Sequence, residues 1–146
     1  MVMMTFTVEE ALRYAKESAI EQWVHNFLNS AGNNKPFSDG LKLQKRYWTG
    51  PFEIRLDRLT RCCGPEPEMK YYIAPESWEK EIKTFCTLIQ EGWDMPPLIV
   101  EHIDGQLIVN DGNHRLEAMI RMKIQTGWVI VWNSHVQQEI HHFIAQ

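Results

Sequence analysis

The sequence predicts an α+β fold, in which a small sheet is flanked by helices and one further helix is added at the N-terminus. Short apolar runs, each bounded by glycine, proline or aspartate turn signals, recur in the second half of the chain. Two longer stretches carry apolar residues at helical spacing. From these observations we expect an N-terminal helix and connecting segment over residues 1–50, followed by a sheet domain over residues 51–146.

The first element should be one helix that starts at a capping box, Thr7–Glu10, with threonine at the cap and glutamate three residues later. Apolar residues at helical spacing continue to Leu28, and Gly32 with two neighbouring asparagines should end the helix near residues 30–34. Residues 33–40 contain Pro36 and Gly40 and are predicted to be a loop. We expect the helix to pack on the domain; a contact between two copies in a homodimer is the alternative.

The first strand is expected at Phe52–Leu59, where apolar and charged residues alternate as far as Asp57. Phe52, Ile54 and Leu56 should face the core. Residues 61–68 contain a glycine and two prolines and should form a loop. A helix should then begin at Pro75, whose fixed φ suits a first helical position, and end at Gly92.

The stretch Pro96–Trp132 predicts the centre of the fold. It contains two apolar runs joined by the hairpin signal Asp104-Gly105, a turn at Gly112, an amphipathic helix, and a third apolar run from Trp128. We interpret it as strand, hairpin, strand, glycine turn, helix and strand. A second capping box at residues 134–137 predicts a short C-terminal helix.

The turn at Gly112 has a chemical implication. A glycine lets a ligand approach the backbone closely, and the first N–H groups of a helix have no intrahelical partner and favour negative charge. With His114 and Arg115 beside them, these groups predict a cradle for phosphate or carboxylate. The alternative is that Asp111 or Asn113 merely caps the helix and Arg115 lies in solvent.

The residues Asp111–Ala118, DGNHRLEA, preceded by Pro96–Val100, PPLIV, resemble the signature of the ParB/sulfiredoxin superfamily. Known members of this superfamily are ParB partition proteins, sulfiredoxin and free-serine kinases. The resemblance implies a small mixed sheet with flanking helices, and a turn that binds nucleotide phosphates. It therefore implies a nucleotide ligand, ATP, ADP or CTP, together with Mg²⁺.

The resemblance also implies a set of site residues. The expected nucleotide- and phosphate-binding residues are Asp111, Gly112, Asn113, His114, Arg115 and, in the loop that lies near the nucleotide in related proteins, Arg61. The catalytic base for a transfer reaction would be Asp57 or Glu66, between which the sequence does not choose. No metal site made by the protein is expected, because the three cysteines lack Cys-x-x-Cys spacing and neighbouring histidines on a helix point apart.

The residues narrow the function that the resemblance implies. Asn113 stands where sulfiredoxin has its cysteine, so sulfiredoxin activity is not expected. The segment after Gly127 is too short for the helix-turn-helix module of ParB proteins, and a net charge of -4 disfavours contact with DNA by this chain alone. We expect a nucleotide-binding domain that acts as a phosphoryl-transfer or nucleotide-hydrolysing enzyme on a small-molecule acceptor. The alternatives are a non-catalytic, nucleotide-switched adaptor and a DNA partition or processing accessory.

Length and composition set the remaining expectations. The chain has 146 residues, 44% hydrophobic and 23% charged, which suits a globular domain. It contains no apolar run of membrane-spanning length and no signal peptide pattern, so we expect no membrane association and a cytoplasmic location. Three cysteines in such a protein are expected to be free thiols.

Overall fold

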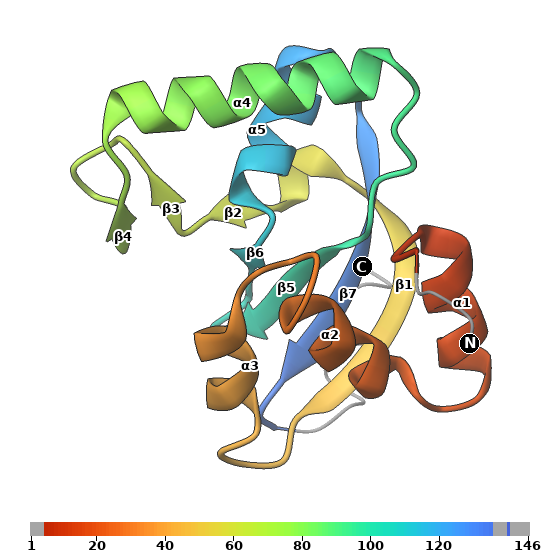
Figure 1. Ribbon diagram of the computed structural model, residues 1–146. Helices are drawn as coiled ribbons and strands as arrows, with labels where there is room; N and C mark the ends of the chain where they lie inside the picture. The colour runs from red at the N-terminus through yellow and green to blue at the C-terminus, as the bar shows by residue number, and fades with distance from the viewer. Residues whose placement is uncertain (1–4, 136–139, 141–146) are drawn as a thin grey trace.

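A computed structural model describes residues 5–135 and residue 140. Within these residues a five-stranded sheet has the order β1-β7-β5-β6-β2 (Figure 1). Its strands are β1 (Tyr47–Arg55), β2 (Thr60–Arg61), β5 (Leu98–Ile103), β6 (Gln106–Asp111) and β7 (Thr126–Asn133). The pairs β1–β7 and β5–β6 are antiparallel, whereas β5–β7 and β2–β6 are parallel. The prediction of an α+β fold with a small mixed sheet is thereby confirmed.

Helices cover both faces of this sheet (Figure 1). They are α1 (Val8–Lys16), α2 (Ile20–Leu28), α3 (Lys35–Leu41), α4 (Pro75–Gln90) and α5 (Asn113–Arg121), with a 3-10 turn at Leu56–Arg58 and a small separate sheet of β3 (Cys63–Gly64) and β4 (Tyr71–Tyr72). The N-terminal helices lie on one face. On the other face α5 covers the sheet, and α4 lies over α5.

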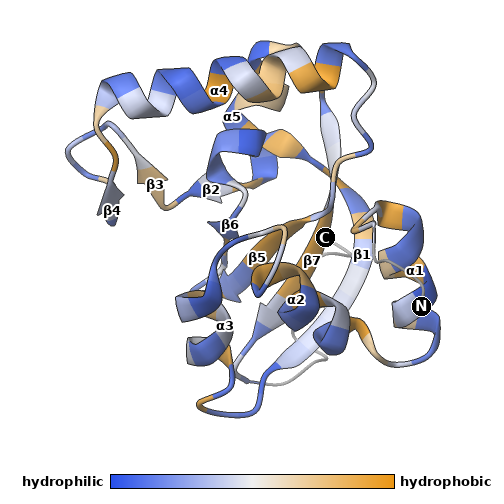
Figure 2. Ribbon diagram, in the orientation of Figure 1, coloured by the Kyte–Doolittle hydropathy of each residue, from blue (hydrophilic) through white to orange (hydrophobic). Residues whose placement is uncertain are grey.

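Alternation along the central strands explains this layering, because successive side chains of a strand point to opposite faces. Ile99 and Ile130 belong to a buried cluster with the N-terminal helices. Their neighbours Leu98 and Val129 belong to a second cluster, together with Leu116 of α5. Figure 2 shows β5 and β7 as the apolar centre between the two helical layers.

The prediction of one continuous N-terminal helix is wrong, because the helix breaks between α1 and α2. Ser18 adopts a left-handed φ of 59°, and the Ala19 N–H donates to the Tyr14 carbonyl at 2.8 Å, which ends α1 in a Schellman-type turn. The expectation that this region packs on the domain is confirmed, since Trp23 and Leu28 of α2 are fully buried. Formation of a homodimer stays a prediction.

Two further boundaries differ from the prediction. Residues 35–40 of the expected loop belong to α3, which Pro36 opens and whose last residue, Leu41, is buried in the core. The first strand begins at Tyr47 instead of Phe52 and gives way at Leu56 to the 3-10 turn, although Ile54 and Leu56 are buried as expected. The predicted division at residues 50 and 51 therefore falls within β1, and the assignment of two regions stays a prediction.

The elements from Pro75 onward follow the prediction. Asp104 and Gly105 both have positive φ, 52° and 73°, as a two-residue hairpin turn requires. Gly92 has a φ of 88° after the end of α4, and α5 and β7 lie where the pattern placed them. The predicted C-terminal helix falls largely on residues 136–139 and 141–146, outside the described residues. In the described part of the chain, no helix combines the length and apolar character needed to cross a bilayer.

Candidate ligand-binding site

Gly112 forms the turn between β6 and α5 and requires the freedom of a glycine. Its φ is 107°, in the left-handed region. A Cβ atom at this position would lie 2.5 Å from Leu98 Cδ2 and 2.8 Å from Arg115 Nη2. The turn therefore excludes other residues both by its backbone conformation and by the close approach of Leu98 and Arg115.

The N-terminus of α5 has no side-chain cap. Gly112 stands at the cap position, and the first amide of α5 with a helical partner is that of Leu116, which donates to the Gly112 carbonyl at 2.8 Å. The alternative in which Asp111 or Asn113 caps the helix is therefore wrong. The amides that precede Leu116 are left to a ligand or to water, and the helix dipole makes this position favourable for an anion.

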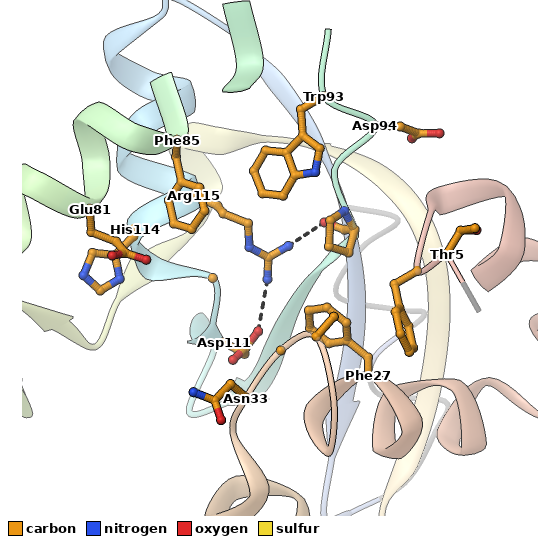
Figure 3. Close-up of a pocket in the computed structure, with 15 residues that line it drawn as sticks. Thr5, Phe27, Asn33, Glu81, Phe85, Trp93, Asp94, Asp111, His114 and Arg115 are labelled. Carbon is orange, nitrogen blue, oxygen red and sulfur yellow. Dashed lines mark hydrogen bonds and ion pairs between the residues drawn. The ribbon is translucent and has the colours of Figure 1, made fainter. Parts of the chain in front are cut away.

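Arg115 does not lie in solvent. Its buried side chain stabilises the turn through hydrogen bonds. Only 5% of the residue is exposed. Its guanidinium donates to the Pro96 carbonyl at 2.6 Å and to the Asp111 carboxylate at 3.0 Å (Figure 3). Asp111 also accepts from Asn34 Nδ2 at 3.2 Å, which links the turn to the segment before α3. These bonds fix the diproline, the turn and the N-terminal region relative to one another.

A cavity of about 420 Å³ lies in front of this turn, within the range of small-molecule sites. Its polar end is formed by Asp111, Gly112, His114 and Arg115. The remaining lining residues are Thr5, Phe6, Phe27, Ala31, Gly32 and Asn33 from the N-terminal region and Glu81, Phe85, Trp93, Asp94 and Pro96 from α4 and the segment after it. Phe27 of α2 and the segments before α1 and after α2 thus complete one wall of the cavity.

Aromatic rings line the cavity away from the turn. Phe85 and Trp93 are stacked, with ring centroids 5.3 Å apart and planes within 10°. Phe27 lies across from them in Figure 3, and the Arg115 guanidinium is 5.7 Å from the centre of its ring. A flat aromatic ligand can stack on such surfaces.

The charges around the cavity are mostly negative. Glu81, Asp94 and Asp111 contribute carboxylates, and the one arginine of the lining is already paired with Asp111. Burial lowers the pKa of His114; the Glu81 carboxylate opposes this shift and Arg61 adds to it. His114 is therefore mostly neutral near pH 7. The residues that line the cavity thus offer an anion at the turn no unpaired cationic side chain.

Asn113 faces away from the cavity and into the protein. Its carboxamide oxygen accepts from the Cys62 amide at 2.9 Å, and its Nδ2 donates to the Val109 carbonyl at 3.0 Å. The fold also brings the thiols of Cys62 and Cys63, 50 residues earlier in the chain, to within 3.7 and 3.5 Å of this nitrogen. Only the backbone of Asn113 is available for the predicted phosphate contact.

The other predicted site residues, Arg61, Glu66 and Asp57, lie in two other places. Arg61 donates to Glu66 at 2.6 Å and lies 4.8 Å from the centre of the Trp78 ring. Asp57 pairs with Arg55 on the exposed surface. None of Arg61, Asp57 and Glu66 lines the cavity. Trp78 connects Arg61 to the cavity, because the ring of His114, which lines the cavity, also packs against Trp78 with ring centroids 4.6 Å apart.

Several lining residues were not anticipated from the sequence. Glu81 lies one turn before Phe85 on α4, and this i, i+4 spacing could have placed both side chains on the same helix face. Trp93 and Asp94 directly follow the terminating Gly92 and precede the diproline, a position that also brings them to the turn. Phe27 and Asn33 gave no signal, since the approach of α2 to the turn is a tertiary contact.

No model of a known protein family matches the chain, and no curated protein matches it. Several solved structures are similar to this chain. Sulfiredoxin from Arabidopsis thaliana is 20% identical with a TM-score of 0.44, over 66% of this chain and 98% of that one. A free serine kinase in complex with AMP is 15% identical with a TM-score of 0.43, over 60% of this chain and 32% of that one. A Pnob8-like ParB N-terminal domain is 16% identical with a TM-score of 0.44, over 68% and 34%.

These structural neighbours include sulfiredoxin and ParB N-terminal domains, the families that the stretch Pro96–Ala118 resembles. The chain spans about a third of the length of the kinase and ParB structures. Likeness at this level concerns the fold alone. What this protein binds has to be inferred from its own residues.

Proposed function

We propose that this protein binds a nucleotide, as its magnesium complex, in the cavity between α4, α5 and the N-terminal helices. The observation that supports this most directly is the uncapped N-terminus of α5, opened by Gly112 and facing a cavity with aromatic rings along its other walls. Backbone amides at a helix start suit a phosphate, and Phe85 and Trp93 suit a base. The two features lie at different parts of one cavity, as the two ends of a nucleotide require.

We infer that a magnesium ion accompanies the nucleotide from the negative charge of the cavity. Three carboxylates line it, and in the part of the chain that the structure describes no three histidine, cysteine or acidic side chains come together to hold a metal. Mg²⁺ is commonly held by one or two carboxylates, water and the phosphates of the substrate. Glu81 or Asp94 fits that role, which leaves the other carboxylate free. When bound, the ion would neutralise the phosphates beside these carboxylates.

The test is calorimetric titration of the native protein with ATP, ADP and CTP, each with magnesium and with excess EDTA. We expect binding of at least one nucleotide with magnesium and loss of that binding in EDTA. Trp93→Leu should weaken the affinity by about five- to a hundredfold, because one stacked base is worth roughly 1–3 kcal/mol. Tyr72→Leu, at a 64% exposed aromatic outside the cavity, is the control and should bind as the native protein does. Failure of all three nucleotides to bind would contradict the proposal.

A second proposal concerns turnover. Phosphoryl transfer to a small-molecule hydroxyl needs a carboxylate base beside the acceptor. Of the acidic residues considered, Glu81 and Asp94 line the cavity, whereas Asp57 and Glu66 do not. We therefore place the base at Glu81 or Asp94. Release of ADP from ATP with a panel of small hydroxyl compounds, lost in one of the variants Glu81→Gln and Asp94→Asn while that variant still binds the nucleotide with magnesium, supports this assignment. Binding without release would assign the cavity to a non-catalytic switch.

A further inference from the structure

Two cysteine thiols meet outside the cavity, that of Cys62 between β2 and β3 and that of Cys63 at the start of β3. Cys62 is buried and Cys63 is half-buried, and their sulfurs lie 3.6 Å apart. Asn113 at the start of α5 holds the pair: its carboxamide oxygen accepts from both backbone amides, at 2.9 and 3.4 Å, and its nitrogen lies near both sulfurs. The two thiols are thus presented side by side by a rigid element.

The environment of the pair favours one thiolate near neutral pH. The hydrogen bond from the Cys63 thiol lowers the pKa of Cys62 to about 7; burial opposes this shift and the Asn113 carboxamide adds to it. The same hydrogen bond raises the pKa of Cys63, as does burial. A thiolate is the nucleophilic and ligating form of cysteine, so Cys62 is the reactive member and Cys63 is its proton-bearing neighbour.

The distance between the sulfurs selects the kind of atom that could bridge them. With sulfur bonds of about 2.3 Å, as thiolates make to zinc, a separation of 3.6 Å corresponds to an angle of about 100° at the bridging atom. A linear two-coordinate ion does not fit this angle. Zinc would need further protein ligands, and the described residues contain no group of three histidine, cysteine or acidic side chains that could supply them. A pyramidal atom that already carries a third substituent meets both conditions: its bond angles are near the angle that the two sulfurs require, and it needs no further ligand from the protein.

We propose that Cys62 and Cys63 form a two-thiol binding site for a thiophilic trivalent metalloid, of which arsenic(III) is the representative. With an organoarsenic(III) oxide, two As–S bonds form and the bonding between arsenic and oxygen breaks. The Cys63 thiol supplies one proton, and the other comes from the Cys62 thiol or, where Cys62 is already a thiolate, from solvent. Both protons leave with the arsenic-bound oxygen as one molecule of water. No electrons are transferred, so the step needs no oxidant or reductant. Cys63 is the more exposed of the two, and the metalloid reaches the pair from its side.

The experiment uses the reduced full-length protein and phenylarsine oxide, read by intact-protein mass spectrometry. We expect one adduct that survives excess monothiol and is removed by a dithiol. Cys62→Ser and Cys63→Ser should each lower the affinity on the order of a hundredfold or more, because two-point attachment is lost. Cys86→Ser, at the third cysteine, whose sulfur instead lies 3.8 Å from the Ala118 carbonyl, is the matched control and should bind like the native protein.

Circular dichroism of each variant separates loss of the site from loss of the fold, and Cys63→Ser is the milder change because Cys63 is only half-buried. An adduct on the native protein that a monothiol removes would overturn the proposal. So would an adduct retained by folded Cys63→Ser, or one lost in folded Cys86→Ser. None of these outcomes bears on the nucleotide site, which is tested without arsenic.

Discussion

At the scale of single residues, Gly112 and Arg115 determine the shape of the candidate site. Gly112 supplies a left-handed turn that leaves α5 uncapped, and Arg115 fills the space that a side chain at Gly112 would need. The sequence pointed to both residues but assigned Arg115 to the ligand. Its bonds to Pro96 and Asp111 show that it first holds the turn together.

Gly112→Ala should destabilise the protein by about 2–3 kcal/mol, because a left-handed alanine is strained and its Cβ would also meet Leu98 and Arg115. Gly92→Ala is the matched control. Gly92 has a similar φ of 88°, but a Cβ there meets no atom within 4 Å, so this change should cost only about 1 kcal/mol of strain. Urea unfolding of both variants measures the difference. Equal losses would show that the space in front of Gly112 can adjust.

Arg115→Met should lower the free energy of unfolding by about 3–5 kcal/mol, because it removes the charged partner of the Asp111 carboxylate and the donor to two proline carbonyls in a buried place. Arg121→Met, on the same helix, removes a more exposed arginine that pairs with Glu79 and Glu117, and should cost much less. Chemical denaturation of the two variants makes the comparison. A loss at Arg115 no larger than at Arg121 would contradict a structural role for the buried pair.

At the scale of elements, the order and type of most segments could be predicted, and their ends could not. The hairpin at Asp104-Gly105 and the helices α4 and α5 follow from local signals that no tertiary contact overrides. The break at Ser18 lacks the glycine that would have predicted it. The helix α3 forms in a segment whose Gly40 favours a loop. Both depend on packing of apolar side chains against the sheet.

The stability of the contact between α5 and α4 should depend on pH through His114 of α5, whose ring packs on Trp78 of α4. Burial lowers the pKa of His114 below its ordinary 6.5, so the unfolded chain binds a proton more readily than the folded one. Stability should therefore fall as the pH decreases through about 6.5, and level off below the folded-state pKa.

Urea unfolding between about pH 7.5 and 5 should show a smaller loss in His114→Gln than in the native protein. Burial also lowers the pKa of His25, so part of the pH dependence of stability remains in both proteins. The difference between the two curves therefore reports His114. Parallel curves would show that His114 does not contribute in this way.

At the scale of the whole molecule, the candidate site depends on three parts of the chain that meet only in the folded state. The turn at Gly112 was predictable because its chemistry is local. The opposite walls were not, because Phe27 and Asn33 reach the cavity only when α2 packs on β5 and β7. Asp57 and Glu66, which follow β1 in sequence, are absent from the lining and pair instead with Arg55 and Arg61.

The central claim is that an anion contacts the backbone amides at the start of α5, and the most direct measurement removes one of them. His114→Pro deletes the His114 N–H at the second position of α5, where the N–H has no partner within the helix, and His114→Ala deletes the same side chain but keeps the N–H. With both variants shown to be folded, we predict that magnesium–nucleotide affinity measured by calorimetry is about tenfold or more weaker for His114→Pro than for His114→Ala, the value of one charge-assisted hydrogen bond. Equal affinities in the two variants would contradict the claim.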